Sequence, residues 1–380
     1  MIRPICLVLL VFLVACRPES VPTHPVAPTS PAPASPTAPS VALSATPSPT
    51  VAQLIYPYTI DGLRHHQFQS GVIKIISTLS KTDIYTSYLI SYPSDGLRIT
   101  GVMQIPAQGH APFPVILMDH GYFNREQYKS GDGTDRAAEY LNKHGYLTLS
   151  SDYRSWGGSD AGPSLFYSGL AIDVINLLNA VPSIPQADPQ RVGIWGHSMG
   201  GAVTMKVLTV DPRLRAGVLY STVSADDADV LRRWGLGCIG DIAAGERQLD
   251  CNSSDVVPLS LAPDLIQAYY RASTDAAVLE QTSPIDHLGL VTAPVEINYG
   301  TKDGQTSAGT PPEWSQKLYN AFEQAGKDAQ LYAYEGEFHS FNGDAWIAFM
   351  ERSARFFDQY VKGAEVNPVL TRTPASLPER

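Results

Sequence analysis

The chain has 380 residues, of which 44% are hydrophobic and 17% charged, and its formal net charge is −10. This hydrophobic content is enough for a sizeable core, and the low share of charged residues excludes a long, charged, disordered chain. The balance is acidic and no run rich in lysine and arginine occurs. We therefore expect a globular protein that has no nucleic-acid partner.

Residues 1–15 have the pattern of an export signal, with Arg3 ahead of an almost wholly apolar run over 5–14. A membrane-spanning helix needs about 20 apolar residues, so this run is too short to stay in a bilayer. It ends in Leu13-Val14-Ala15-Cys16, which resembles the lipobox of bacterial lipoproteins, where the Cys receives a lipid after cleavage. We expect an exported protein that is lipid-anchored to the cell envelope through Cys16; the alternative is an ordinary secretory signal.

Residues 16–52 have the composition of a linker. The stretch 17–50 contains ten Pro and eleven Ser or Thr, with Arg17 and Glu19 as its charged residues. Such a composition favours extended chain and cannot form a core. Beyond it, Cys238 and Cys251 remain for the folded part. In an oxidising compartment this pair predicts one local disulfide, with two buried free thiols as the alternative.

Strand and helix signals then alternate along the chain. A pair of strands over 85–105 is joined by a turn at 93–96, and it precedes buried strands at 114–118, 146–150, 191–195, 216–222, 294–299 and 330–334. Helical patterns cover 136–144, 170–181, 199–209, 312–326 and 344–361. Alternation of this kind predicts an α/β protein with a mostly parallel central sheet and helices on both of its faces.

One stretch interrupts the alternation. Residues 223–290 lie between two strands that a short crossover should join, so they are predicted to form an inserted cap, whose clearest helix covers 264–271. The predicted organisation is a signal at 1–15, a linker at 16–52, an α/β domain at 53–365 that contains the cap, and a tail at 366–380.

The motif Gly196-His197-Ser198-Met199-Gly200 carries the chemistry. It follows a predicted strand and precedes a predicted helix, which is the context of a nucleophile elbow. Ser198 is the candidate nucleophile. Gly196 and Gly200 leave out side chains where the backbone must turn tightly. The helix that follows favours an oxyanion at its N-terminus.

A nucleophilic serine needs a base, and the base needs an acid that orients it. Two histidines follow Ser198 in the chain, and of these His339, in the loop after the last strand, is better placed than His287. Asp303 comes directly after the strand at 294–299, at the sheet edge where catalytic groups gather. Its rivals Glu335, Glu337 and Asp344 are interpreted as solvated loop charges. The predicted triad is Ser198, Asp303 and His339.

An oxyanion hole needs two backbone N–H groups. We expect one from Met199 and the other from Tyr122, with Gly121 allowing close approach. His120 is either a structural residue of the same loop or part of the site.

Three segments carry a family resemblance. Asp152-Tyr153-Arg154-Ser155-Trp156-Gly157-Gly158-Ser159, the Ser198 motif with Gly201, and Ser283-Pro284-Ile285 with the strand and Asp303 after it resemble the catalytic domain of the prolyl oligopeptidase family. The resemblance covers roughly residues 90–362. It implies an α/β-hydrolase fold and acyl transfer through Ser198, Asp303 and His339. Dienelactone-hydrolase-like proteins and acyl esterases share these patterns, and no room for the family's N-terminal β-propeller precedes residue 90.

The expected function is therefore a serine hydrolase that needs neither a metal nor an organic cofactor. Its substrate is a small ester or a short peptide: the family resemblance favours a peptidase, and the missing propeller favours an esterase. A non-catalytic binding lipoprotein on the same scaffold is the remaining alternative, because a fold does not by itself imply a function.

Overall fold

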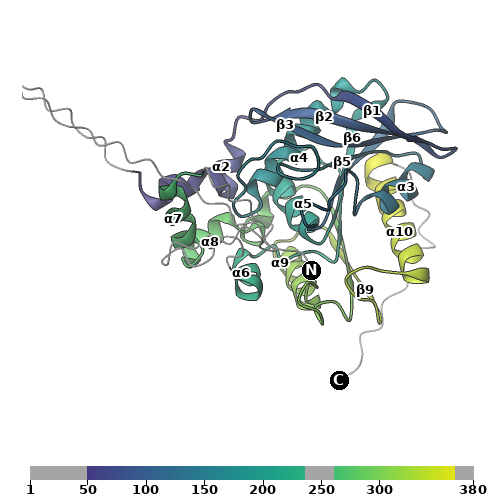
Figure 1. Ribbon diagram of the computed structural model, residues 1–380. Helices are drawn as coiled ribbons and strands as arrows, with labels where there is room; N and C mark the ends of the chain where they lie inside the picture. The colour runs from purple at the N-terminus through teal and green to yellow at the C-terminus, as the bar shows by residue number, and fades with distance from the viewer. Residues whose placement is uncertain (1–48, 236–260, 364–380) are drawn as a thin grey trace, which may run out of the picture. The chain divides into compact units, whose positions relative to one another are not determined.

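A single nine-stranded sheet forms the centre of the computed structural model, which describes residues 49–235 and 261–363 (Figure 1). The strand order is β1-β2-β3-β5-β4-β6-β7-β8-β9. The neighbouring pairs β1–β2, β2–β3 and β3–β5 are antiparallel, while the strands from β5 to β9 in this order are parallel. The bounds are β1 (Lys74–Lys81), β2 (Tyr85–Ser94), β3 (Leu97–Pro106), β4 (Phe113–Asp119), β5 (Leu147–Ser151), β6 (Ala187–His197), β7 (Gly217–Tyr220), β8 (Val295–Gly300) and β9 (Ala329–Tyr334).

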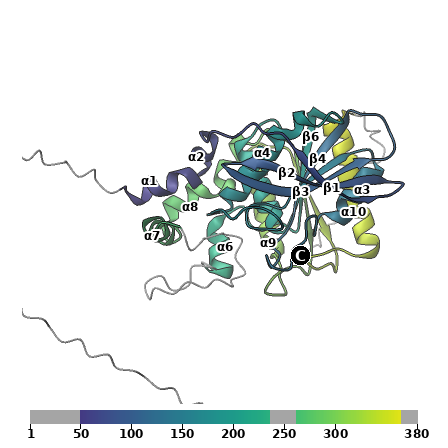
Figure 2. The same ribbon diagram turned by 45° about the horizontal axis from the view of Figure 1, so that its top comes forward.

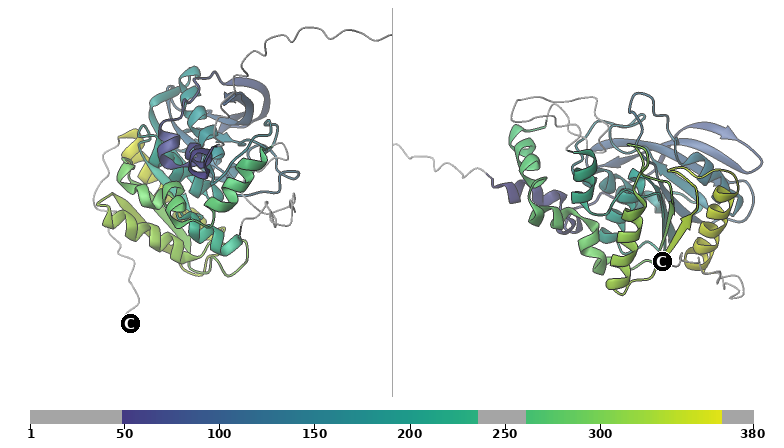
Figure 3. Two further views of the ribbon diagram at one scale, coloured as in Figure 1. Left: turned by 90° about the vertical axis from the view of Figure 1, so that its left-hand side faces the viewer. Right: turned by 90° about the horizontal axis from the view of Figure 1, so that it is seen from below.

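Helices cover both faces of the sheet, as the views in Figure 3 show. One buried apolar cluster joins the sheet to α4, α5 and α9, and a second joins the opposite face to α3 and α10. The helices are α1 (Val51–Ile55), α2 (Ile60–Arg64), α3 (Asp135–Lys143), α4 (Ser168–Ala180), α5 (Met199–Val210), α6 (Asp227–Trp234), α7 (Pro263–Ala272), α8 (Ala276–Thr282), α9 (Pro312–Gln324) and α10 (Gly343–Phe357). This arrangement confirms the predicted α/β-hydrolase fold.

The elements expected from the sequence are present, with bounds that shift by a few residues. The largest omission is β1, which the periodicity did not predict. Its eight residues are all exposed, so they lack the alternation of buried and exposed side chains that reveals a strand. The strand lies at the edge of the sheet, where no second neighbour covers it.

Two helices of the predicted cap, α7 and α8, lie beside α1, the first helix of the described chain (Figure 2). Ile55 of α1 shares a buried apolar cluster with Leu165, Phe166, Ile266 and Leu279. The helix α1 begins at Val51, two residues before the predicted domain boundary. Thr50 caps it, since its hydroxyl accepts a hydrogen bond from the Gln53 N–H while the Gln53 side chain accepts one from the Thr50 N–H.

Several expectations concern other parts of the chain. Cys16, Cys238 and Cys251, the export signal, most of the linker, and the tail lie outside the described residues. Across 49–235 and 261–363, no helix is both long and apolar enough to cross a membrane.

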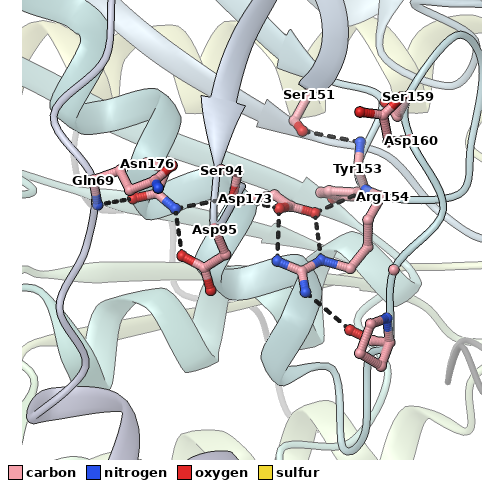
Figure 4. A network of polar contacts seen from close by, with 12 residues as sticks. Gln69, Ser94, Asp95, Ser151, Tyr153, Arg154, Ser159, Asp160, Asp173 and Asn176 are labelled. Carbon is pink, nitrogen blue, oxygen red and sulfur yellow. Dashed lines mark hydrogen bonds and ion pairs between the residues drawn. The ribbon is translucent and has the colours of Figure 1, made fainter. Parts of the chain in front are cut away.

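A buried ion pair fixes the loop that follows β5 (Figure 4). The Arg154 guanidinium donates to both carboxylate oxygens of Asp173 on α4, at 2.9 and 3.0 Å, and to the Pro163 carbonyl oxygen at 2.9 Å. Ser94, at the end of β2, donates to the same carboxylate at 2.6 Å. The pair is almost fully buried, so its hydrogen bonds have to offset the cost of removing both charges from water. It ties the β2–β3 turn, the loop and α4 together.

Strand β8 carries a buried carboxyl group. Glu296 of β8 is fully buried; its Oε1 accepts hydrogen bonds from Asn298 at 3.0 Å and Ser353 at 2.9 Å, and its Oε2 has no partner among the described residues. Burial raises the pKa of Glu296 from 4.5 to about 7, although both hydrogen bonds oppose that change. Asp119, at the end of β4, is buried likewise, and burial raises its pKa to about 8.

These two carboxyls make stability fall as pH rises. The folded state holds their protons at pH values where the unfolded state has lost them, so their contribution is complete below about pH 4 and is lost as pH rises through 7 to 8. We expect Glu296→Gln to remove the contribution of Glu296 to this pH dependence, which is about 3 kcal/mol of unfolding free energy across the range. Urea unfolding at a series of pH values would measure it. An unchanged slope in the variant would contradict the pKa change.

Candidate active site

Ser198 sits at a sharp turn between β6 and α5. Its backbone has φ 57° and ψ −120°, a conformation that side-chain-bearing residues rarely adopt. The turn is possible because its neighbours lack side chains: a Cβ on Gly196 would lie 2.4 Å from the Gly200 oxygen, and one on Gly200 would lie 2.0 Å from the Asp119 oxygen. Ser198 thus occupies the N-cap of α5, and the residue is 9% exposed.

Asp303 and His339 contact each other directly. His339 Nδ1 lies 2.9 Å from Asp303 Oδ2 and 3.2 Å from Oδ1. The Asp303 side chain is 1% exposed and the His339 side chain 25% exposed. Asp303 follows β8, and His339 lies in the loop between β9 and α10, so parallel strands bring both to the same sheet edge as Ser198.

The Asp303 carboxylate is enclosed by residues 303–310, which we call the acid loop. Oδ1 accepts hydrogen bonds from the backbone N–H groups of Gly304 at 2.7 Å and Thr310 at 2.9 Å, and Oδ2 accepts one from the Thr310 hydroxyl at 2.7 Å. Burial alone would raise the pKa of Asp303, but the hydrogen bonds from His339, Thr310 and Gly304 outweigh burial and lower it. The carboxylate is therefore held ionised and in one orientation.

Thr310 is a site residue that the sequence did not reveal, because a threonine seven residues after the acid carries no motif. We expect Thr310→Val to lower kcat roughly tenfold to a hundredfold, since Asp303 loses the hydroxyl that fixes Oδ2. Thr310→Ser keeps a hydroxyl and should retain most of the activity. Steady-state kinetics of both variants would measure this. Equal losses in the two variants would contradict a role for the hydroxyl.

His197 links the serine turn to the His339 loop. Its Nε2 lies 3.1 Å from the His339 carbonyl oxygen, and its ring stacks on Tyr220 with centroids 4.3 Å apart. Burial, together with the charge of His339 when it is protonated, lowers the pKa of His197 to about 3. A neutral His197 can therefore donate to that carbonyl. The Ser198 hydroxyl makes no hydrogen bond within the described residues, to His339 or to any other group. The hydrogen bond between a nucleophilic serine and its base often forms only when substrate is bound.

The segments that carry the two expected oxyanion donors border Ser198. Met199 is the first residue of α5 and is buried. Gly121 lies against the serine, since a Cβ placed on it would be 3.1 Å from the Ser198 Cβ. The next residue, Tyr122, is half-buried, with its ring edge-on to Trp156 at 6.4 Å. The loop at 121–122 therefore borders the serine turn.

The remaining candidates have other surroundings. The His120 ring is fully buried between Tyr128 and Tyr153, and its nitrogens lie near the Gly121 and Asp152 carbonyl oxygens, as a structural residue would. His287 contacts the Glu280 carbonyl oxygen of α8 at 3.0 Å.

The rival acids do not contact His339 either. Glu335 and Asp344 are exposed, and Glu337 accepts a hydrogen bond from the Asn342 N–H at 3.1 Å. Over 49–235 and 261–363, no cluster of His, Cys, Asp and Glu could hold a metal ion.

This fold, with the serine turn and the Asp303–His339 pair, defines a serine hydrolase of the α/β-hydrolase class. The family model described as serine aminopeptidase, S33, matches residues 115–345, which is more than half of the chain. The chain belongs to this family.

Two curated relatives illustrate the range of sequence similarity. An uncharacterized 31.7 kDa protein of Escherichia coli is 24% identical over 292 residues, which are 71% of this chain and 96% of the relative. The uncharacterized peptidase YuxL of Bacillus subtilis is 25% identical over 266 residues, which are 65% of this chain and 34% of the relative.

Solved structures share the fold. An acetyl xylan esterase from Paenibacillus sp. R4 has a TM-score of 0.56 and 17% identity, with 81% of this chain and 93% of that chain covered. A putative dipeptidyl aminopeptidase IV from Bacteroides ovatus has a TM-score of 0.52 and 18% identity, with 74% of this chain covered. The match spans 36% of the dipeptidyl aminopeptidase.

Proposed function

We propose that Ser198, His339 and Asp303 form a catalytic triad that hydrolyses the acyl bond of a short peptide or small ester. The observation that carries the proposal is the Asp303–His339 pair, at 2.9 Å, on the sheet edge that also holds the strained Ser198 turn. An ionised, immobile carboxylate beside Nδ1 keeps the proton on that nitrogen and leaves Nε2 as the base.

The proposed steps follow from these positions. Ser198 Oγ attacks the substrate carbonyl carbon while His339 Nε2 takes the hydroxyl proton. The Met199 and Tyr122 N–H groups hold the tetrahedral oxyanion. The carbonyl then re-forms as the bond to the leaving group breaks, and the His339 proton passes to that group. Water, deprotonated by His339, attacks the acyl-enzyme. The bond between the acyl carbon and Ser198 Oγ then breaks, the acid leaves, and His339 returns its proton to Ser198 Oγ.

For the substrate, we infer a short peptide or aminoacyl amide first, because the family description is serine aminopeptidase and YuxL is named a peptidase. A small ester is the second candidate. It is supported by the acetyl xylan esterase from Paenibacillus sp. R4, because this chain covers 93% of that protein.

A paired assay tests both proposals. A fluorophosphonate probe should label the wild-type protein at Ser198 and should not label Ser198→Ala. Hydrolysis of aminoacyl and prolyl p-nitroanilides would then be compared with that of p-nitrophenyl acyl esters. Amide turnover comparable to ester turnover supports the peptidase, and ester turnover alone supports the esterase. Absent labelling of the wild-type protein would contradict the triad itself.

We also propose that the mature protein is exported and carries a lipid on Cys16. The support is the sequence of the first sixteen residues, which resembles a lipoprotein signal. Metabolic labelling with a palmitate analogue in a bacterial host, with Cys16→Ala as the matched control, tests this. Incorporation that persists in the variant, or is absent from both proteins, would contradict it.

A further inference from the structure

The C-terminal end of α6 holds the acid loop from outside. Arg233 Nη2 donates to the carbonyl oxygens of Gly304 at 3.1 Å and Thr306 at 2.8 Å. The Trp234 indole N–H donates to the Ser307 carbonyl oxygen at 2.9 Å. Two consecutive residues of a cap helix therefore bind three carbonyls of the segment that encloses Asp303.

Gly304 connects these contacts to the candidate acid. Its N–H donates to Asp303 Oδ1 at 2.7 Å, while its carbonyl accepts from Arg233. The φ of Gly304 is +83°, and a Cβ at this position would lie 2.7 Å from the Pro311 Cα. The backbone at Gly304 is therefore closely confined. Residues 305–308 are exposed. The contacts from α6 are thus well placed to keep the loop closed over the carboxylate.

The helix α6 is itself fixed to the hydrolase body. Lys317 of α9 binds Asp229 at 2.8 Å and also pairs with Asp226. The Trp234 ring packs edge-on against Trp314 of α9, with centroids 5.3 Å apart. The helix α9 follows the acid loop directly, so α6 and α9 hold the loop between them. Hydrogen bonds donated from such a support can fix the loop's position.

We propose that Arg233 and Trp234 are positioning residues for the hydrolytic reaction, acting through the acid loop on Asp303 and hence on His339. The inference rests on the proposed triad. It makes the cap a part of the catalytic machinery: the cap helix α6 orients the acid, in addition to any role the cap has over the substrate. Disturbing α6 should then change turnover more than substrate binding, because neither side chain has to touch the substrate.

The test uses two variants in the full chain. Arg233→Met keeps an unbranched stem and removes the two donors, and Trp234→Phe keeps an aromatic ring against Trp314 and removes one. With p-nitrophenyl acetate, we expect Arg233→Met to lower kcat roughly tenfold with KM changed by less than about twofold, and Trp234→Phe to have a smaller effect in the same direction. Arg232→Met is the matched control, since Arg232 is exposed and binds Asp229 instead of the loop; its kcat should stay at the wild-type value.

A double-mutant cycle separates positioning from general loosening. The rate of fluorophosphonate labelling at Ser198 would be measured for Arg233→Met and Trp234→Phe, in the wild-type and the Asp303→Asn backgrounds. If the side chains act through Asp303, each variant slows labelling in the wild-type background and has little further effect once Asp303 is gone. Equal slowing in both backgrounds would overturn the inference while leaving the triad intact. A wild-type protein that is not labelled would overturn both. If Arg233→Met does not fold, Trp234→Phe alone decides.

Discussion

Replacing Ser198 by alanine should lower kcat by on the order of 10⁶-fold, because no other group of the triad can take over the role of the nucleophile. The hydroxyl is the group that bonds to the substrate carbonyl in the proposed mechanism, and the rest of the site is left in place. The remaining activity would come from the oxyanion donors and from substrate binding. Steady-state kinetics on the substrate class identified by the paired assay would measure the loss.

A companion variant separates chemistry from folding. Ser198→Gly should be as inactive as Ser198→Ala but more stable than the wild-type protein, by about 1 kcal/mol. The reason is the φ of 57° and ψ of −120° at this position, which glycine adopts without steric cost. Urea unfolding of the three proteins would measure the difference. A glycine variant less stable than the wild type would contradict the strained turn.

Asp303→Asn should lower kcat by about 10⁴-fold with the fold preserved. The carboxylate accepts the His339 Nδ1–H at 2.9 Å, whereas an amide nitrogen in the same place would donate and so stabilise the other tautomer. His339 would then hold its proton on Nε2, where the serine proton has to be received. Single-turnover kinetics would locate the loss in the acylation step.

The matched control for this variant is Glu335→Gln. Glu335 is an exposed carboxylate between β9 and His339, and it is the same kind of group without the contact. Its replacement should leave kcat near the wild-type value. A large loss of kcat in Glu335→Gln, together with a small loss in Asp303→Asn, would contradict the assignment of Asp303 as the acid of the triad.

The triad candidates could be predicted because each has a local signature. Ser198 lies in a glycine-framed turn between a strand and a helix, and Asp303 and His339 follow strands whose apolar runs are evident. Thr310 and Arg233 have no such signature. Thr310 contacts Asp303 across 7 residues of sequence, and Arg233 contacts Gly304 across 71 residues. Only the folded chain brings these groups together.

The fold shows the same division. Buried parallel strands and amphipathic helices leave a period in the sequence, so the central sheet was predictable. The strand β1 leaves none, since its side chains are exposed on both faces. The packing of α1 with α7 was also hidden, because Ile55, Phe166 and Ile266 come from three distant parts of the chain.

That packing has a consequence for the order in which the protein folds. Ile55 shares one buried apolar cluster with Ile266 and Leu279, which follow it by more than two hundred residues of chain. Closing such a loop costs chain entropy that is repaid only after the intervening strands have already brought its ends together. We expect the cluster of α1, α7 and α8 to form last during folding. In native-state hydrogen exchange, its amides should open at lower free energy than those of β4, β6 and β7.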